Sequence, residues 1–344
     1  MGARNASAGR KTINLALQGG GSHGAFAWGA LDRLLEDDRI AVEGVVGTSA
    51  GAMNAVVTAY GLTLDGNEGA RRALRSFWEA VASAGTWSIM QPSWLDHMIS
   101  PGSLDYSPGW VLMDTLSRIW SPYQTNPANY HPLREILKEQ IDFDVLSRSD
   151  KVKLFVCASN VFTNRLRVFD LSEISVDAVI ASACIPSVFH AVEINGEHFW
   201  DGGFMGNPPI FPLIYNCVSP DVLLIMVNPI HIERVPQTAQ AILDRINTLS
   251  FNSSLMREMR AINFVNRLVE SGYDDGGRLK KMLIHCIDAE DEMSRLGVSS
   301  KLNVCRDFLK WLFELGRDRA DVFLRDHFDK IGRDSSTSIE QRFL

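Results

Sequence analysis

The sequence predicts an α/β fold with a mostly parallel central sheet and helices on both of its faces. Apolar strands are expected at 13–17 and 42–46, and each is followed by a glycine-rich turn and then by a segment with helical spacing of its apolar residues. An alternation of strand, turn and helix is typical of a parallel sheet covered on both faces. Further apolar runs at 153–159, 222–227 and 282–287 are expected to extend this sheet.

The remaining elements of the sheet region are shorter. Asn195-Gly196 joins two short apolar runs, and this dipeptide is the strongest local signal for a β-hairpin. Pro186 follows a helical segment and is expected to lie beyond its end. The expected elements are helices at 25–35, 53–60 and 175–183 and strands at 167–169, 191–194 and 197–200.

Residues 83–131 differ in composition from the segments around them. Prolines and tryptophans are frequent there, which favours irregular structure or short helices inserted over one end of the sheet. Two interpretations stay open: a packed connector, or a lid or wall over a ligand site. The tryptophans within this stretch include Trp87, Trp94, Trp110 and Trp120.

Beyond residue 234 the chain is expected to be mostly helical. Apolar residues recur there at helical spacing, and Gly316, directly after them, is expected to end the helix. Most such stripes face a protein core, and contact with a membrane surface is the alternative. The polar tail 334–340 is expected to be mobile. The stripe consists of Leu302, Cys305, Phe308, Leu309, Leu312 and Leu315.

Composition and charge exclude several classes of function. The chain has 344 residues and a formal net charge of −7, so it offers no general electrostatic attraction to nucleic acid or to anionic lipid. Any membrane contact is therefore expected to be local and peripheral. No apolar run reaches the ~18 residues of a membrane-spanning helix, and the N-terminus lacks the apolar stretch of a secretory signal.

The five cysteines are widely spaced along the chain. Their odd number and their spacing fit neither a disulfide framework nor a metal site, and no histidine pair has zinc-binding spacing. Several of them lie in apolar runs, where a cysteine is usually a small core residue. We therefore expect a reducing, cytoplasmic environment and no bound metal.

Residues Gly47-Thr48-Ser49-Ala50-Gly51 have the pattern G-x-S-x-G between an expected strand and an expected helix. A sharp turn at this position exposes the serine hydroxyl, and it needs small residues because the backbone is crowded there. The N-terminus of the following helix favours negative charge beside the serine. Ser49 is therefore the candidate nucleophile, with Gly47 and Gly51 as supporting residues.

A second glycine-rich turn, Gly19-Gly20-Gly21-Ser22-His23-Gly24, also lies between an expected strand and an expected helix. Glycines let backbone N–H groups converge on an anion such as the oxyanion of acyl transfer. The same residues satisfy the dinucleotide-binding pattern G-x-G-x-x-G, but the second strand does not end in the acidic residue that would hold a ribose. We therefore interpret the turn as an oxyanion site with the candidates Gly19, Gly20, Gly21 and Ser22, and with Gly24 as support.

Asp201-Gly202-Gly203 follows the second strand of the expected hairpin. A carboxylate at a strand end, followed by glycines, can lie close to another backbone segment. Asp201 can orient a histidine that activates the serine, or it can accept the serine proton itself. An Asx-type turn is the structural alternative. Strand alternation places His198 on the opposite face from Asp201, which favours a site without histidine.

Together, these three motifs resemble the patatin-like phospholipase family. The segment Ala181-Ser182-Ala183-Cys184-Ile185-Pro186 and the dipeptide Asn207-Pro208 are also similar to that family, and the resemblance covers roughly residues 13–215. It implies a three-layer α/β/α fold and hydrolysis of lipid acyl esters through an acyl-enzyme, without a cofactor. It also implies that Ser49 is the nucleophile and Asp201 the base, with no catalytic histidine.

One position departs from the family pattern. Many members have arginine or lysine before the last glycine of the loop, where this chain has His23, which is less reliably charged near neutral pH. The domain organisation that we expect is a flexible N-terminus at 1–11, a catalytic domain at 12–215 that contains the insertion at 83–131, and a C-terminal part at 216–344. That last part is expected to hold two strands and mostly helices, packed on the catalytic domain.

The sequence thus predicts a lipid acyl hydrolase of the phospholipase A or esterase type, with a lipid or fatty-acyl ester as substrate and no nucleic-acid partner. Acyl transfer or thioester hydrolysis with the same residues is an alternative, because the chemistry at the serine is shared. A catalytically silent lipid-binding protein is another alternative, and the three intact motifs argue against it.

Overall fold

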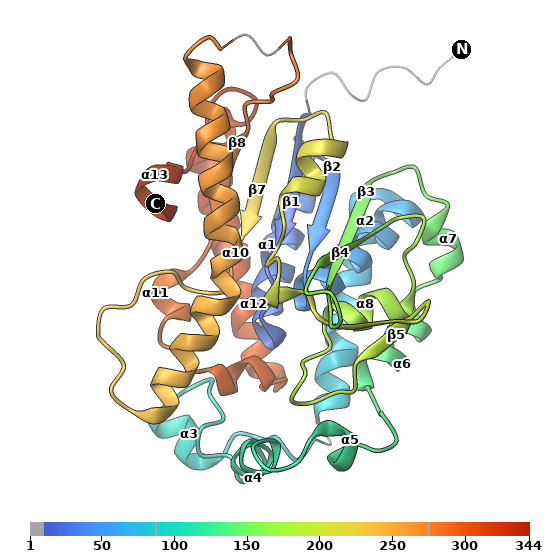
Figure 1. Cartoon of the computed structure of the whole chain (residues 1–344), viewed down its shortest axis with the longest axis vertical. Coiled ribbons are helices and arrows are strands. Elements are labelled where there is room, and N and C mark those ends of the chain that lie inside the picture. The colour runs from blue at the N-terminus through green and yellow to red at the C-terminus, as the bar shows by residue number, and fades with distance from the viewer. Residues whose placement is uncertain (1–9, 87, 274–275) are drawn as a thin grey trace.

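The computed structural model describes residues 10–86, 88–273 and 276–344 of the chain. A central sheet of eight strands lies at its middle, in the order β5-β6-β3-β2-β1-β7-β8, with β4 paired to β3 (Figure 1). The strands are β1 (Lys11–Leu17), β2 (Ile40–Gly47), β3 (Lys153–Asn160), β4 (Leu166–Asp170), β5 (Val192–Ile194), β6 (Glu197–Asp201), β7 (Asp221–Ile225) and β8 (Leu283–Ile287).

The sheet is mostly parallel, as predicted. The pairs β1–β2, β1–β7, β2–β3 and β7–β8 are parallel, whereas β3–β4, β3–β6 and β5–β6 are antiparallel. The hairpin β5–β6 turns at Asn195-Gly196, where both residues have positive φ. The sheet includes strands from both sides of residue 215, because β7 pairs directly with β1.

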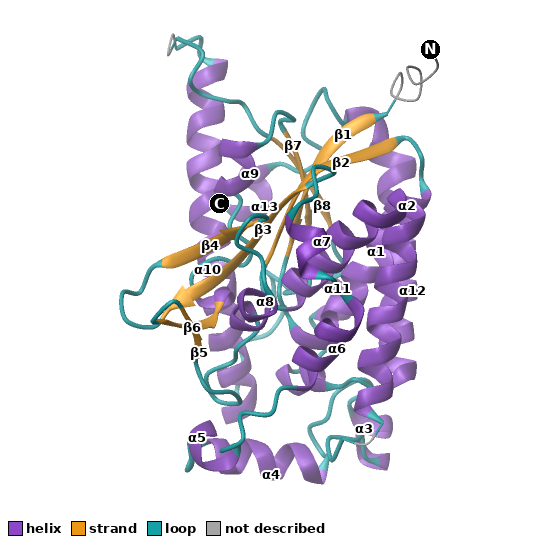
Figure 2. Ribbon diagram, turned by 90° about the vertical axis from the view of Figure 1, so that its right-hand side faces the viewer, coloured by secondary structure: helices purple, strands orange, loops and turns teal. Residues whose placement is uncertain are grey.

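Helices cover both faces of the sheet and make three layers (Figure 1, Figure 2). The helices are α1 (Gly24–Glu36), α2 (Ala50–Gly85), α3 (Trp94–Ile99), α4 (Pro108–Ser117), α5 (Pro122–Thr125), α6 (Pro132–Gln140), α7 (Phe143–Ser147), α8 (Val176–Ser182), α9 (Phe211–Asn216), α10 (Ala239–Glu270), α11 (Glu290–Met293), α12 (Arg306–His327) and α13 (Ile339–Phe343).

The apolar runs of the strands divide between two cores. In β1, Leu15 and Leu17 belong to the core shared with α1, α2, α8 and α12, whereas Ala16 between them belongs to the core shared with α9, α10 and α13. Successive side chains of a strand point to opposite faces, so a strand with helices on both faces is apolar along its whole length. The three-layer α/β/α fold expected from the sequence is therefore confirmed.

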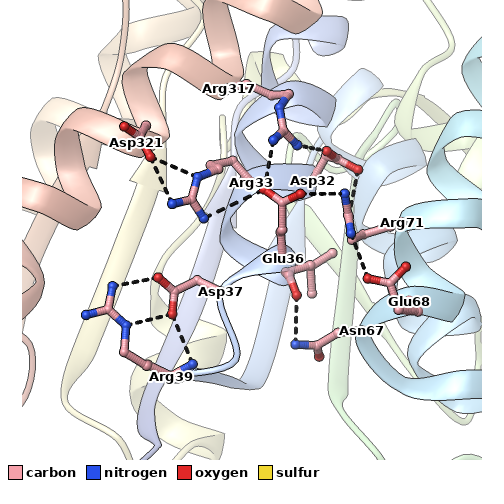
Figure 3. Close-up of polar contacts among 11 residues, drawn as sticks. Asp32, Arg33, Glu36, Asp37, Arg39, Asn67, Glu68, Arg71, Arg317 and Asp321 are labelled. Carbon is pink, nitrogen blue, oxygen red and sulfur yellow. Dashed lines mark hydrogen bonds and ion pairs between the residues drawn. The ribbon is translucent and has the colours of Figure 1, made fainter.

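A network of ion pairs fixes α12 to the helices of the N-terminal half. The buried carboxylate of Asp32 in α1 accepts hydrogen bonds from Arg71 of α2, at 3.0 Å, and from Arg317 of α12 (Figure 3). The same two guanidinium groups bind Glu36 at 3.0 and 2.8 Å. Asp32 is almost fully buried, so loss of either arginine would leave its charge poorly compensated between the three helices.

Two expectations about the C-terminal region are wrong. Gly316 does not end a helix: it lies inside α12, where a side chain would collide with the carbonyl oxygen of Phe26, so its role is close packing of α12 on α1. The polar tail 334–340, expected to be mobile, instead pairs with β8. There the N–H of Thr337 donates to Ile284 O at 3.1 Å, and Ser335 Oγ accepts from Ile284 N at 3.0 Å.

The apolar stripe around Phe308, Leu309 and Leu312 is buried and faces the core. Most of the N-terminal segment that was expected to be flexible, 1–9, lies outside the described residues, and Lys11 already belongs to β1. Among the described residues, no helix combines the length and the hydropathy that crossing a membrane requires.

The carboxyl ends of β1, β2 and β7 point toward the end of the molecule that is formed by α3, α4 and α5 (Figure 1). The insertion 83–131 provides these three short helices, in agreement with its predicted character. Side chains at the ends of the strands therefore lie between the sheet and the insertion.

Candidate active site

Ser49 lies in a tight turn between β2 and α2, and its backbone has φ 55° and ψ −123°. A positive φ is unusual for a residue with a side chain, and it turns the hydroxyl away from the strand. A side chain at Gly47 would collide with the carbonyl of Gly51, and one at Gly51 would collide with the carbonyl of Leu17. The N–H of Ser49 donates to Ser182 Oγ at 2.9 Å, which fixes the turn to α8.

The glycine loop 19–24 is held in place by three side-chain amides. The N–H of Gly19 donates to Asn207 Oδ1 at 2.7 Å, and its carbonyl accepts from Asn228 Nδ2 at 2.7 Å. Gln18 Oε1 accepts from the N–H groups of Val227 and Asn228, both at 3.0 Å. The Asn207-Pro208 motif and the segment after β7 thus orient the loop.

This anchoring changes the expectation for the oxyanion site. The N–H of Gly19 is already engaged by Asn207, so Gly19 anchors the loop and is not free to bind an oxyanion. Gly20 and Gly21 line a cavity together with Ser49. Their N–H groups have no such acceptor among the described residues, and Gly21 has a φ of 58° that favours glycine. Of the four candidates from the sequence, Gly20, Gly21 and the buried Ser22 therefore remain.

Asp201 lies at the end of β6, and its side chain is buried. Its N–H donates to Cys184 O at 2.8 Å, and its Oδ1 accepts from the N–H of Gly203 at 2.7 Å. A side chain at Gly202 would collide with the carbonyl of Cys157 in β3, which explains the glycine there. The segment 181–186 thus contacts both Asp201, through Cys184, and Ser49, through Ser182.

Ser49 and Asp201, far apart in the sequence, lie on the same cavity. Burial raises the pKa of Asp201 to about 6, although hydrogen bonds from the N–H of Gly203 and from the Ser49 side chain, and the charge of Lys301, each lower it. Burial disfavours a carboxylate because the charge loses its hydration. The pKa of Asp201 is therefore closer to neutral pH than that of an ordinary aspartate, on a cavity that it shares with Ser49.

Ser49 lies where two cavities of about 260 Å³ each meet. Both cavities also include Gly21, Ile185, Lys301 and Leu302. One of them is partly polar, and its lining includes Asp114, Arg118, Asp201, Gln240, Asp244 and Asn247. The other is apolar, and its lining includes Met53, Phe77, Trp78, Val81, Leu133, Ile136 and Phe189.

Lys301, in the 3₁₀ helix Val298–Leu302, is a site residue that the sequence analysis missed. Its Nζ donates to Asn228 Oδ1 at 2.8 Å and lies 5.6 Å from the ring centroid of Phe251. Burial lowers the pKa of Lys301 to about 8, while the charges of Asp244 and Asp201 raise it. No local pattern marks this lysine, because only the folded chain brings it to the glycine loop.

His23 does not supply the positive charge that many family members have at that position of the loop. Its Nε2 is 2.7 Å from Ser300 Oγ, and burial together with the charge of Lys301 lowers its pKa to about 3. His23 is therefore neutral near pH 7, and the cation beside the loop comes from Lys301.

No histidine is among the residues that line the polar cavity with Asp201. His198 is partly exposed on β6, 3.9 Å from Glu193, on the face away from the buried Asp201. His131 lines the apolar cavity, where it stacks on Phe189 with 3.9 Å between the ring centroids. Burial lowers the pKa of His131 to about 4, so that its ring is neutral near pH 7.

Residues 15–214 match the sequence model of the family described as patatin-like phospholipase. The comparison with curated proteins gave no significant match.

Solved structures with a similar arrangement include VipD from Legionella pneumophila and the ExoU–SpcU complex from Pseudomonas aeruginosa. The VipD structure is 17% identical with a TM-score of 0.45, and the match covers 92% of this chain and 67% of that one. The ExoU match is 16% identical with a TM-score of 0.37, and covers 94% of this chain and 52% of that one, so this chain spans about half the length of ExoU. The family match spans more than half of the chain, and the protein belongs to the patatin-like phospholipase family.

Proposed function

We propose that the protein is a lipid acyl hydrolase in which Ser49 is the nucleophile and Asp201 the general base. The observation that carries this proposal is that Ser49 and the buried carboxylate of Asp201 line the same cavity, and that Ser49 also lines an adjoining apolar cavity. Membership of the patatin-like phospholipase family supports a lipid-hydrolysing enzyme.

The reaction needs only groups of the chain and one water molecule. Ser49 Oγ attacks the acyl carbonyl while Asp201 takes the hydroxyl proton, and the N–H groups of Gly20 and Gly21 stabilise the oxyanion. The bond to the leaving alcohol breaks, and Asp201 returns the proton to that alcohol. Asp201 then takes a proton from water, which attacks the acyl carbonyl; the bond to Ser49 Oγ breaks, Asp201 gives the proton to Ser49 Oγ, and the fatty acid is released.

The two cavities suggest how a substrate is oriented. An acyl chain fits the apolar cavity beside Phe77 and Trp78, because apolar side chains stabilise it by excluding water. The leaving group then lies in the polar cavity with Asp244 and Asn247. In this arrangement the ester carbonyl lies at the junction, next to Ser49 and Gly21.

The roles of Ser49 and Asp201 predict two different losses. Ser49→Ala is expected to abolish labelling by a fluorophosphonate and ester hydrolysis, since it removes the proposed nucleophile. Asp201→Asn is expected to lower kcat by ~10²–10⁴-fold, the usual contribution of a general base. Hydrolysis of a panel of lipid and fatty-acyl esters measures both losses, with Asp150→Asn at an exposed site as the control.

Three outcomes of that assay would redirect the proposal. Transfer of the acyl group to an added alcohol in preference to water would make the protein an acyltransferase, and turnover of thioesters alone would make it a thioesterase. A wild-type protein that binds lipid but takes no label and hydrolyses nothing would be a binding protein.

The pH dependence follows from the pKa of Asp201, which is about 6. The base must be ionised, so kcat/KM is expected to fall about tenfold per pH unit below pH 6 and to level off above it. Lys301→Met removes a positive charge that lowers this pKa, so the fall is expected to begin at a higher pH. Lys301→Arg keeps the charge and is the control; identical pH profiles for all three proteins would contradict the role of Lys301.

The apolar cavity predicts a change in chain-length preference. Ala84 lines this cavity and is exposed, so Ala84→Trp is expected to fill part of it without disturbing the core. Because a mismatch of one methylene in an apolar pocket changes kcat/KM by ~10–200-fold, long-chain esters should lose at least about tenfold while acetyl esters change little. Ser83→Trp, an exposed neighbour outside the cavity lining, is the control, and equal losses for short and long chains would show that the acyl chain lies elsewhere.

A further inference from the structure

Large apolar side chains are exposed on all three short helices that form one end of the molecule. Met98 of α3 is 74% exposed, Ile119 after α4 is 70% exposed, and Trp94 of α3 is 69% exposed. Leu112 of α4 and Tyr123 of α5 are more than half exposed. The helices α3, α4 and α5 lie together at this end in both views (Figure 1, Figure 2). We call the exposed apolar side chains of residues 88–130 the apolar face.

Charged groups are scarce on this face. With histidine counted as neutral, residues 88–130 contain only four charged side chains, with no lysine among them. Asp96 is buried, and Asp105 accepts a hydrogen bond from Ser299 at 2.6 Å. The last two, Asp114 and Arg118, form an ion pair with each other at 2.9 Å. The apolar face therefore has no cation that is free to attract an anionic surface.

The apolar face is continuous with the polar cavity at Ser49. In α4, Trp110 and Met113 line that cavity, while Val111 and Leu112 between them are 50% and 54% exposed. Leu243 of α10 also lines the cavity and is 44% exposed. The helix α4 thus lines the cavity with some of its side chains and exposes others to solvent, so that whatever covers the apolar face lies next to the cavity.

We propose that the apolar face docks the protein onto lipid surfaces without net charge, such as a phosphatidylcholine bilayer. Exposed apolar patches mark sites of contact with membranes or proteins, and tryptophan and tyrosine are favoured at the membrane interface. The choice of a lipid occupant rests on the proposed function, because a lipid substrate has to pass from its surface to Ser49. Because the face has no free cation to bind anionic headgroups, we expect it to dock on a neutral lipid surface and not on an anionic one.

Flotation with phosphatidylcholine vesicles tests this proposal, and the Ser49→Ala protein is used so that the lipid is not consumed. We expect this protein to float with the vesicles, unaffected by salt and not more strongly when phosphatidylglycerol is added. The triple change Trp94→Asp, Met98→Asp and Ile119→Asp is expected to weaken binding at least about tenfold, because three apolar side chains that would be buried in the lipid become charged. Val218→Asp, at an 83% exposed position near the opposite ends of the strands, is expected to bind normally.

Other results would overturn the proposal. These are no binding to phosphatidylcholine, binding that needs phosphatidylglycerol and is lost in high salt, and a triple variant that binds as well as its parent. Self-association that the triple change abolishes, without vesicle binding, would show that a second copy of the chain covers the face.

The same triple change in a protein with Ser49 intact separates docking from catalysis. Its hydrolysis of a short-chain, water-soluble ester is expected to be unchanged, which also shows that the variant folds, while its activity on vesicles falls. If the wild-type protein floats but hydrolyses neither substrate, docking stands and the proposed function fails.

Discussion

The proposed chemistry depends on one interaction, that of the Ser49 hydroxyl with a buried carboxylate that lines the same cavity. Burial brings the pKa of Asp201 to about 6, so this group can hold and release a proton near neutral pH without a histidine. Two strand ends must meet for this to happen, and glycines at 47, 51 and 202 permit it because backbone carbonyls occupy the space of their side chains. The site destabilises the folded state, since a buried carboxylate and a serine with positive φ both cost free energy.

Much of this arrangement could be predicted from the sequence, because it follows from local rules. Strands buried on both faces are apolar along their length, and this pattern predicted the sheet. A crowded turn requires glycine, and the glycines beside Ser49 and Asp201 marked both residues in the sequence. Other features depend on residues that meet only after folding. The N–H of Gly19, unlike that of Gly20, is bound by the side chain of Asn207. Position 316 is a glycine inside a helix because α1 passes too close to α12 for a larger residue. Lys301 has no motif around it at all.

The region outside the family match contributes to the site as well. Asn228 holds the glycine loop, and Lys301 places a cation beside it, where the loop itself has the neutral His23. The ion pairs of Asp32 with Arg71 and Arg317 hold α12 against the N-terminal helices (Figure 3). The site is therefore built from both halves of the chain.

The most direct test of the central claim is a crystal structure of the protein after reaction with a fluorophosphonate. The account predicts phosphorus bound to Ser49 Oγ, an adduct oxygen ~2.7–3.1 Å from the N–H groups of Gly20 and Gly21, and Asp201 in hydrogen-bond reach of the modified serine. An adduct on another residue, or an oxygen that points away from the glycine loop, would contradict it.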